Sequence, residues 1–367
     1  MKKHTLYTLI LILTTISITA QKMKRKPSKP FESISDLNSY LKSQESENLF
    51  SGVVYVSQNN KTIFQNAYGK SNHKTYKGND LDTKFNIGSI SKVLTKIGIM
   101  QLIDKEKINF SDKVVKFIPE LSMVMADKIT IEHLYRMTSG LGNYWSHDLY
   151  LKNFKKLNNL EDYLPVIANE TLAFKPGTSK AYSNSGYELL GIIIERVSKQ
   201  NYYDYIRENI YHKLGMNNSD SYYRNGKTDN LAIGYTAYNK GEQLSMLNPK
   251  KIGKDKKLMN VHDRFPPRGT AAGGGYSTIK DFIKLSQGLI DNTLFSKEIT
   301  DLFFSYLPKR NPNSKILSVA GASYGICSAI YFDYTQNISV IVLTNIDPST
   351  AMRINGRIVE SFNKGKI

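Results

Sequence analysis

The spacing of hydrophobic residues predicts strands near both ends of the chain and helices between them. Short apolar runs separated by turn residues predict two β-hairpins, 52–57 with 61–68 and 324–332 with 338–344. Apolar residues at helical spacing predict helices at 33–44, 89–104, 131–137, 186–199, 202–214, 278–292 and 349–362.

This order of elements indicates an α/β protein of the α+β kind. Strands from the two ends of the chain can pair into one antiparallel sheet, which leaves the helices between them as an inserted region. We expect that helical insertion at about 105–260. The lysine-rich segment 248–257 is expected to be a surface loop or lid.

The first residues have the character of a secretory signal peptide. Two lysines open the chain, an apolar run follows from Leu6 to Ile18, and Ala20 offers a small residue for cleavage. An uncleaved membrane anchor is the alternative, but the run is shorter than the about 20 residues of a membrane-spanning helix. We therefore expect an exported protein, periplasmic or secreted, with a signal peptide (1–20), a linker (21–32) and one folded domain (33–367).

Composition restricts the function only in part. The formal net charge is +18, from 50 Lys and Arg against 32 Asp and Glu. Because the lysines are scattered, the charge favours contact with an anionic surface such as cell wall over nucleic acid, and solubility alone explains it equally well. The six histidines form no zinc-binding pattern. Cys327 is the only cysteine, which excludes an intramolecular disulfide and favours a buried, inert thiol.

Ser89 and Lys92 form a Ser-x-x-Lys pair at the start of the helix predicted at 89–104. A helix start offers free backbone N–H groups and the positive end of the helix dipole. Lys92 lies three residues after Ser89 and therefore on the same helix face. A desolvated lysine at this place can lose its proton and act as a base, which would make Ser89 a nucleophile without histidine.

The spacing alone is weak evidence, because four other pairs share it and most such pairs are solvated helix faces. These pairs are Ser39/Lys42, Ser71/Lys74, Ser277/Lys280 and Ser361/Lys364. The pair at Ser89 differs from them in the preceding Gly88, in the apolar helix after it and in a series of motifs downstream.

These motifs together resemble one family. They are Gly88 to Lys92, Ile129-Thr130-Ile131, Thr138-Ser139-Gly140-Leu141, Phe174-Lys175-Pro176-Gly177-Thr178, Tyr182-Ser183-Asn184, Leu214-Gly215-Met216, Gly234-Tyr235 and Ala272 to Thr278. In this order they resemble the serine β-lactamase and penicillin-binding-protein superfamily, nearest its class C β-lactamase-related branch. The resemblance covers roughly Gly52 to Asn345 and implies a β-lactamase/transpeptidase-like fold.

The resemblance also implies roles for individual residues. Ser89 would be the acyl-accepting nucleophile, Lys92 its activating partner and Tyr182 the second member of the acid/base system. A neighbouring ammonium would lower the pKa of the Tyr182 phenol. Asn184 would position the substrate, and Gly321 would let a strand approach it while the N–H of Ala322 completes an oxyanion hole with that of Ser89. The resemblance implies no metal and no organic cofactor.

The third motif of the family departs from its pattern. Val319 stands where relatives carry lysine or histidine, so the cation that recognises a substrate carboxylate is missing at this position. Lys315, Arg264 or Arg268 are the candidates to replace it from elsewhere in the chain. Met137 stands where relatives often carry histidine, and we expect it to pack in the core.

The sequence therefore predicts an exported serine hydrolase that forms an acyl-enzyme on an amide or ester acyl donor. Candidate donors are a D-amino-acid peptide, a cell-wall peptide or a small ester. Two alternatives stay open: a catalytically silent protein that binds cell-wall fragments, favoured by Val319, and a true β-lactamase. Nucleic acid is not an expected partner, and the sequence leaves the oligomeric state open.

Overall fold

The structure is a computed structural model that describes residues 29–121, 127–168, 170–239, 256–307, 311, 313–347 and 350–367. The predicted signal peptide, most of the linker and most of the predicted loop at 248–257 lie outside the described residues. Among the residues that are described, no helix has both the length and the apolar character that a membrane crossing requires.

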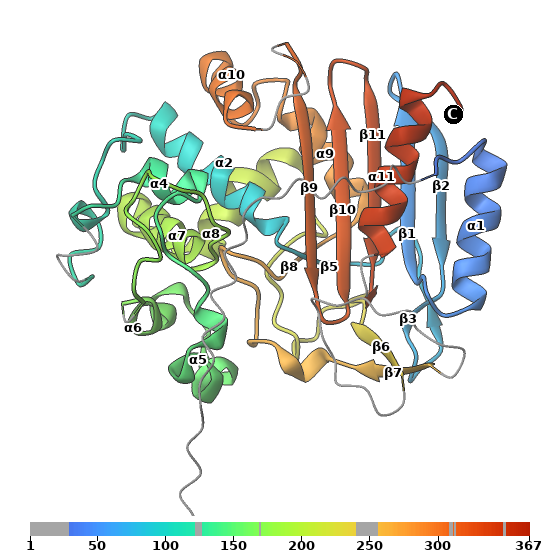
Figure 1. Ribbon diagram of the computed structural model, residues 1–367, viewed down its shortest axis with the longest axis horizontal. Coiled ribbons are helices and arrows are strands. Elements are labelled where there is room, and N and C mark those ends of the chain that lie inside the picture. Colours follow the sequence, from blue (N-terminus) through green and yellow to red (C-terminus); the bar gives the residue numbers. More distant parts are fainter. Residues whose placement is uncertain are drawn as a thin grey trace, which may run out of the picture.

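A five-stranded antiparallel sheet forms the centre of the fold (Figure 1), in the order β2-β1-β11-β10-β9. Its strands are β1 (Gly52–Gln58), β2 (Lys61–Tyr68), β9 (Ile316–Ser323), β10 (Ile326–Asp333) and β11 (Ile338–Thr344). Both predicted hairpins are present, and β1 pairs with β11 from the other end of the chain. The sheet built from both chain ends is thus confirmed.

Two terminal helices cover one face of this sheet. They are α1 (Ile34–Ser46) and α11 (Thr350–Asn363). Their apolar side chains pack with alternate residues of β1, β10 and β11 in one cluster that includes Leu37, Val54, Val342 and Ile358. The Ser33 side chain caps α1 by accepting a hydrogen bond from the backbone N–H of Asp36 at 3.1 Å.

The other helices lie behind the sheet and beyond its β9 edge (Figure 1). They are α2 (Ser91–Asp104), α4 (Ile131–Arg136), α5 (Asp148–Asn153), α6 (Leu164–Ile167), α7 (Ser185–Ser198), α8 (Tyr202–Ile206), α9 (Ile279–Gly288) and α10 (Lys297–Ser305). The central helix α2 is buried on nearly every side and packs against α7. The helix predicted at 202–214 is α-helical from Tyr202 to Ile206, continues as a π-helical turn over Arg207–His212 and returns to α-helix at 213–214.

Three small sheets contain strands that hydrophobic spacing did not predict. They pair β3 (Lys70–Asn72) with β4 (Lys77–Gly78), β5 (Phe85–Gly88) with β8 (Gly275–Ser277), and β6 (Tyr235–Asn239) with both β7 (Lys256–Asn260) and β12 (Ile346–Asp347). The predicted insertion at 105–260 is therefore not purely helical, because β6 and β7 fall in it. Strands of two to five residues hold too few positions to establish a period.

Candidate active site

Ser89 lies in the tight turn that joins β5 to α2. Gly88 has a positive φ of 51°, which glycine adopts without strain, and the turn brings the N–H of Ile90 within 3.1 Å of the carbonyl of Ile87. The α-helix begins at Ser91, so Ser89 precedes it instead of opening it as the sequence predicts. Ser89 is half-buried, and its hydroxyl is reached by two other candidate residues.

Lys92 is buried behind the Ser89 hydroxyl with a relative exposure of 5%. Its Nζ lies 3.4 Å from Ser89 Oγ, 2.6 Å from Asn184 Oδ1, and in contact with the carbonyl oxygen of Ala272. Burial lowers the pKa of Lys92 to about 7, although the carboxylate of Glu188 acts in the opposite direction. A neutral lysine has two N–H groups and one lone pair; Asn184 and Ala272 can accept only, so the lone pair is left for the Ser89 proton.

Tyr182 contacts the same hydroxyl and lines the same cavity as Lys92. Its OH donates a hydrogen bond to Ser89 Oγ at 2.6 Å, while Lys92 Nζ lies 4.8 Å from the centre of its ring. Burial raises the pKa of Tyr182, and the hydrogen bond to Ser89 only partly opposes that rise. The expectation of a lowered pKa is therefore wrong: burial disfavours the phenolate, and Lys92 is not among the groups that shift this pKa.

Asn184 lies immediately before α7 and is 3% exposed. Its Oδ1 accepts from Lys92, and its Nδ2 donates to Asn143 Oδ1 at 2.6 Å. Both ends of the side-chain amide are thus engaged by the protein, in a geometry that holds Lys92 in place. The predicted role of Asn184 in positioning the substrate stays a prediction.

Gly321 brings strand β9 into direct contact with the Ser89 turn. A Cβ atom added to Gly321 would lie 2.1 Å from the carbonyl oxygen of Ile87 and 2.7 Å from the nitrogen of Ser89. In the same way, a Cβ on Gly88 would lie 3.2 Å from the nitrogen of Ala322. Only glycine fits at this crossing of two backbones.

The N–H of Ala322 points out of the sheet edge toward this turn. Ser323 and Ile326 flank a two-residue turn, and Ala322 pairs with Cys327 one position further along. In an antiparallel hairpin, the two residues that flank a two-residue turn are hydrogen-bonded to each other, and the next pair along is not. Ala322 and Cys327 form that next pair. The N–H of Ala322 therefore faces away from β10, toward β5. The N–H of Ser89 donates to no acceptor among the described residues. Two backbone donors are thus available beside the Ser89 hydroxyl.

Glu188 is a buried acid that sequence reasoning missed. It follows Asn184 by one turn of α7 and accepts hydrogen bonds from Tyr144 at 2.8 Å and Thr270 at 2.5 Å. Burial raises its pKa to about 7, against the lowering effect of these bonds and of Lys92. A glutamate inside an otherwise apolar helix face, one turn after the Tyr-x-Asn motif, was the available clue.

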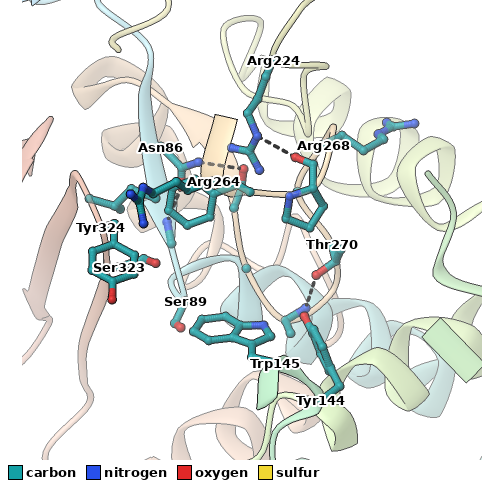
Figure 2. A pocket seen from close by; sticks show the side chains of 18 of the residues that line it. Asn86, Ser89, Tyr144, Trp145, Arg224, Arg264, Arg268, Thr270, Ser323 and Tyr324 are labelled. Carbon is teal, nitrogen blue, oxygen red and sulfur yellow. Dashed lines mark hydrogen bonds between the residues drawn. The ribbon is translucent and has the colours of Figure 1, made fainter. Parts of the chain in front are cut away.

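Two cavities meet at Ser89. One, of about 230 Å³, we call the arginine cavity after Arg224, Arg264 and Arg268, which line it together with aromatic residues (Figure 2). The other, of about 170 Å³, we call the lysine cavity; it is lined by Lys92, Lys96 and Tyr182 and by apolar residues that include Met137 and Val319.

The candidates for the missing cation lie away from Val319. Lys315 forms an ion pair with Asp301 at 2.7 Å and lines neither cavity, and Arg264 and Arg268 line the arginine cavity. Lys92 and Lys96 are the lysines that line the lysine cavity with Val319; Lys96 lies one turn after Lys92 on α2, and the sequence analysis did not consider it. Burial lowers the pKa of Lys96 to about 8, and its Nζ lies 4.4 Å from the centre of the Tyr135 ring.

The described residues support neither a cysteine nucleophile nor a metal site. Cys327 is fully buried, in the cluster under α11, and burial raises its pKa to about 11. Across the described ranges, no three His, Cys, Asp or Glu side chains gather into a metal-binding group.

Known proteins are similar to this chain over most of its length. Residues 42–361 match the family described as Beta-lactamase. Penicillin-binding protein 4* of Bacillus subtilis (strain 168) is 26% identical over 324 residues, 82% of this chain and 69% of that protein. Protein flp of Staphylococcus aureus (strain MRSA252) is 31% identical over 185 residues, which cover 50% of this chain but only 37% of flp.

A solved structure shows the same fold. D-amino acid amidase from Ochrobactrum anthropi SV3, complexed with L-phenylalanine amide, superposes with a TM-score of 0.70 over 90% of this chain and 100% of that chain. At 18% identity this likeness concerns the fold alone.

Proposed function

The chain belongs to the β-lactamase family, which includes serine hydrolases, and we propose that it is an exported serine hydrolase that forms an acyl-enzyme at Ser89. One observation carries the proposal: Ser89 Oγ lies within hydrogen-bonding distance of both Lys92 Nζ, at 3.4 Å, and the Tyr182 OH, at 2.6 Å. A hydroxyl in contact with both a near-neutral amine and a phenol has a base and an acid within reach.

In acylation, neutral Lys92 takes the proton of Ser89 as Oγ bonds to the carbonyl carbon of the donor. The N–H groups of Ser89 and Ala322 stabilise the charge on the carbonyl oxygen. Tyr182 gives its proton to the leaving amine or alcohol as the bond to it breaks, and recovers a proton from protonated Lys92. Water then attacks the acyl-enzyme by the same steps, which releases the acid and restores Ser89.

The substrate is an amide or ester, in keeping with this chemistry. We propose a D-amino-acid peptide, a cell-wall peptide or a small ester as the donor class, since the protein is expected to act outside the cytoplasm. Val319 makes β-lactam hydrolysis the weaker candidate, because valine cannot bind the carboxylate of such a compound.

Covalent labelling with a fluorophosphonate probe tests the proposal. Wild type should be labelled, and Ser89→Ala should not. Lys92→Ala and Tyr182→Phe should slow labelling by about 100-fold or more, the usual scale for loss of general acid–base help. Ser39→Ala is a matched control, because Ser39 and Lys42 have the same spacing on an exposed face of α1.

Labelling of the folded Ser89→Ala protein at the wild-type rate would refute the assignment. A wild type that binds cell-wall fragments without any covalent labelling would instead be the silent binding protein. Turnover of a chromogenic cephalosporin at rates above those of simple esters would identify a true β-lactamase.

A further inference from the structure

The arginine cavity has a strong positive lining. Three arginines line it, and no aspartate or glutamate does so among the described residues. None of the three arginines forms an ion pair with a described carboxylate. An accessible hollow with unpaired guanidinium groups is a place where an anion is favoured.

The three arginines differ in how they face the cavity (Figure 2). The guanidinium of Arg268 is directed away from Ser89 and stacks 3.4 Å from the centre of the Tyr203 ring. Arg224 is half-buried, and its Nε donates a hydrogen bond to the carbonyl oxygen of Pro266 at 2.6 Å. Arg264 is exposed, and its guanidinium contacts the sulfur of Met259 at 4.0 Å.

Arg224 is costly to bury without a counterion. Burial lowers its pKa, and the groups that act in the opposite direction are tyrosines rather than carboxylates. The hydrogen bond to Pro266 and the ring of Phe265, 4.8 Å from the guanidinium carbon, replace part of the lost hydration, but no acidic partner balances the charge. An anion in the cavity would offset that loss.

The position of Tyr182 shows which part of a substrate enters this cavity. Tyr182 lines the lysine cavity and not the arginine cavity. Because Tyr182 protonates the leaving group, that group lies on the lysine side of Ser89. The acyl portion of the donor then lies on the other side, in the arginine cavity.

From this geometry we infer that the enzyme prefers donors whose acyl portion carries an oxyanion group, a carboxylate or a phosphate, bound by Arg264 and Arg224. The inference rests on the proposed function and adds its substrate class. The remaining wall is aromatic, with Tyr144, Trp145, Tyr150, Tyr163, Phe265 and Tyr324, so the carbon chain between the carbonyl and the anion packs on rings.

A pair of esters that differ only in acyl charge tests the inference. Mono-p-nitrophenyl glutarate has a free carboxylate, and its methyl ester is neutral with the same leaving group. A second pair, with a terminal phosphonate and its methyl diester, distinguishes phosphate from carboxylate recognition. We expect wild type to prefer at least one charged member by about tenfold or more in kcat/KM, as a charge-assisted hydrogen bond implies.

Arg264→Gln should reduce this preference by about tenfold, and Arg264→Lys, which keeps the charge, should retain most of it. Arg353→Gln is the matched control, since Arg353 is exposed on α11 at the opposite face of the sheet and should leave the ratio unchanged. Thermal unfolding of each variant checks that the fold is intact. Arg224→Gln serves as the second variant if it folds.

Equal kcat/KM for the charged and neutral members of both pairs, with Ser89 still acylated, overturns the inference and leaves the proposed function standing. A preference that survives in Arg264→Gln and in folded Arg224→Gln overturns it as well. If no ester is hydrolysed and Ser89 is not labelled by the probe, both the proposed function and this inference are overturned.

Discussion

The pKa values of Lys92 and Glu188 shift toward each other from opposite ends of the scale. Burial lowers the pKa of Lys92 to about 7 and raises that of Glu188 to about 7. Each charge favours the other, so Glu188 makes Lys92 harder to deprotonate than burial alone would. The glutamate thereby raises the pH at which the base becomes available.

Glu188→Gln should shift the acid limb of the pH–kcat/KM profile to lower pH. Activity requires neutral Lys92 and so rises as pH passes through its pKa. Removing the carboxylate removes the charge that raises this pKa, so Lys92 becomes neutral at lower pH. Steady-state profiles of the wild type and the variant measure the shift.

Glu195→Gln, further along α7, controls for loss of a glutamate from the same helix, because Glu195 does not influence the pKa of Lys92. An acid limb that stays in place or moves to higher pH in Glu188→Gln would contradict this account.

The residues that meet at the site were predictable from sequence where a short motif includes them. Ser89, Lys92 and Tyr182 meet around one hydroxyl, as the motifs predict. Glu188 and Lys96 could not be assigned in the same way, because their chemistry depends on burial by elements distant in the sequence. The predicted direction of the Tyr182 pKa shift was wrong for the same reason, because the shift depends on burial.

The contact between β5 and β9 fixes the geometry of the site at the scale of elements. Gly321→Ala places a Cβ atom 2.1 Å from the carbonyl oxygen of Ile87, so β9 must move away from the Ser89 turn. The Ala322 N–H moves with it. We expect acylation to slow by about 100-fold or more, the scale for loss of one oxyanion-hole donor.

The rate of probe labelling measures this effect, and circular dichroism checks the fold. Gly356→Ala on α11 is the matched control, because a Cβ there meets no atom within 4 Å. It should label at the wild-type rate. A Gly321→Ala protein that also labels at the wild-type rate would show that this contact does not position the oxyanion donors.

Most of the long elements were predictable and most of the short ones were not; the exceptions among the long elements are β9 and α10, which hydrophobic spacing did not predict. The helices at α1, α7 and α11 and the strands β10 and β11 have enough residues for their periods to be read. Strands β5 and β8 are short, and each is recognised only through its partner elsewhere in the chain.

At the scale of the whole molecule, the N-terminal segment predicts export. The basic start, apolar run and small residue at Ala20 predict cleavage close to Gln21. Intact-mass measurement of protein recovered outside the cytoplasm should show a chain that lacks residues 1–20. Leu11→Arg, which interrupts the apolar run, should keep the full-length chain inside the cell. Exported protein that retains Met1 would contradict the prediction.

The sheet that joins both ends of the chain has a consequence for folding kinetics. Strand β11 lies between β1 and β10, and the N–H of Phe31 bonds to Ser361 Oγ across 330 residues. Contacts of such sequence separation form slowly, because a long loop must close before any of them stabilises the chain. A ribosome that has not yet released the final strands therefore holds a chain whose central sheet cannot form. The central sheet of such a chain is completed only after synthesis ends, so a secretion channel for unfolded polypeptides meets the chain before that sheet exists.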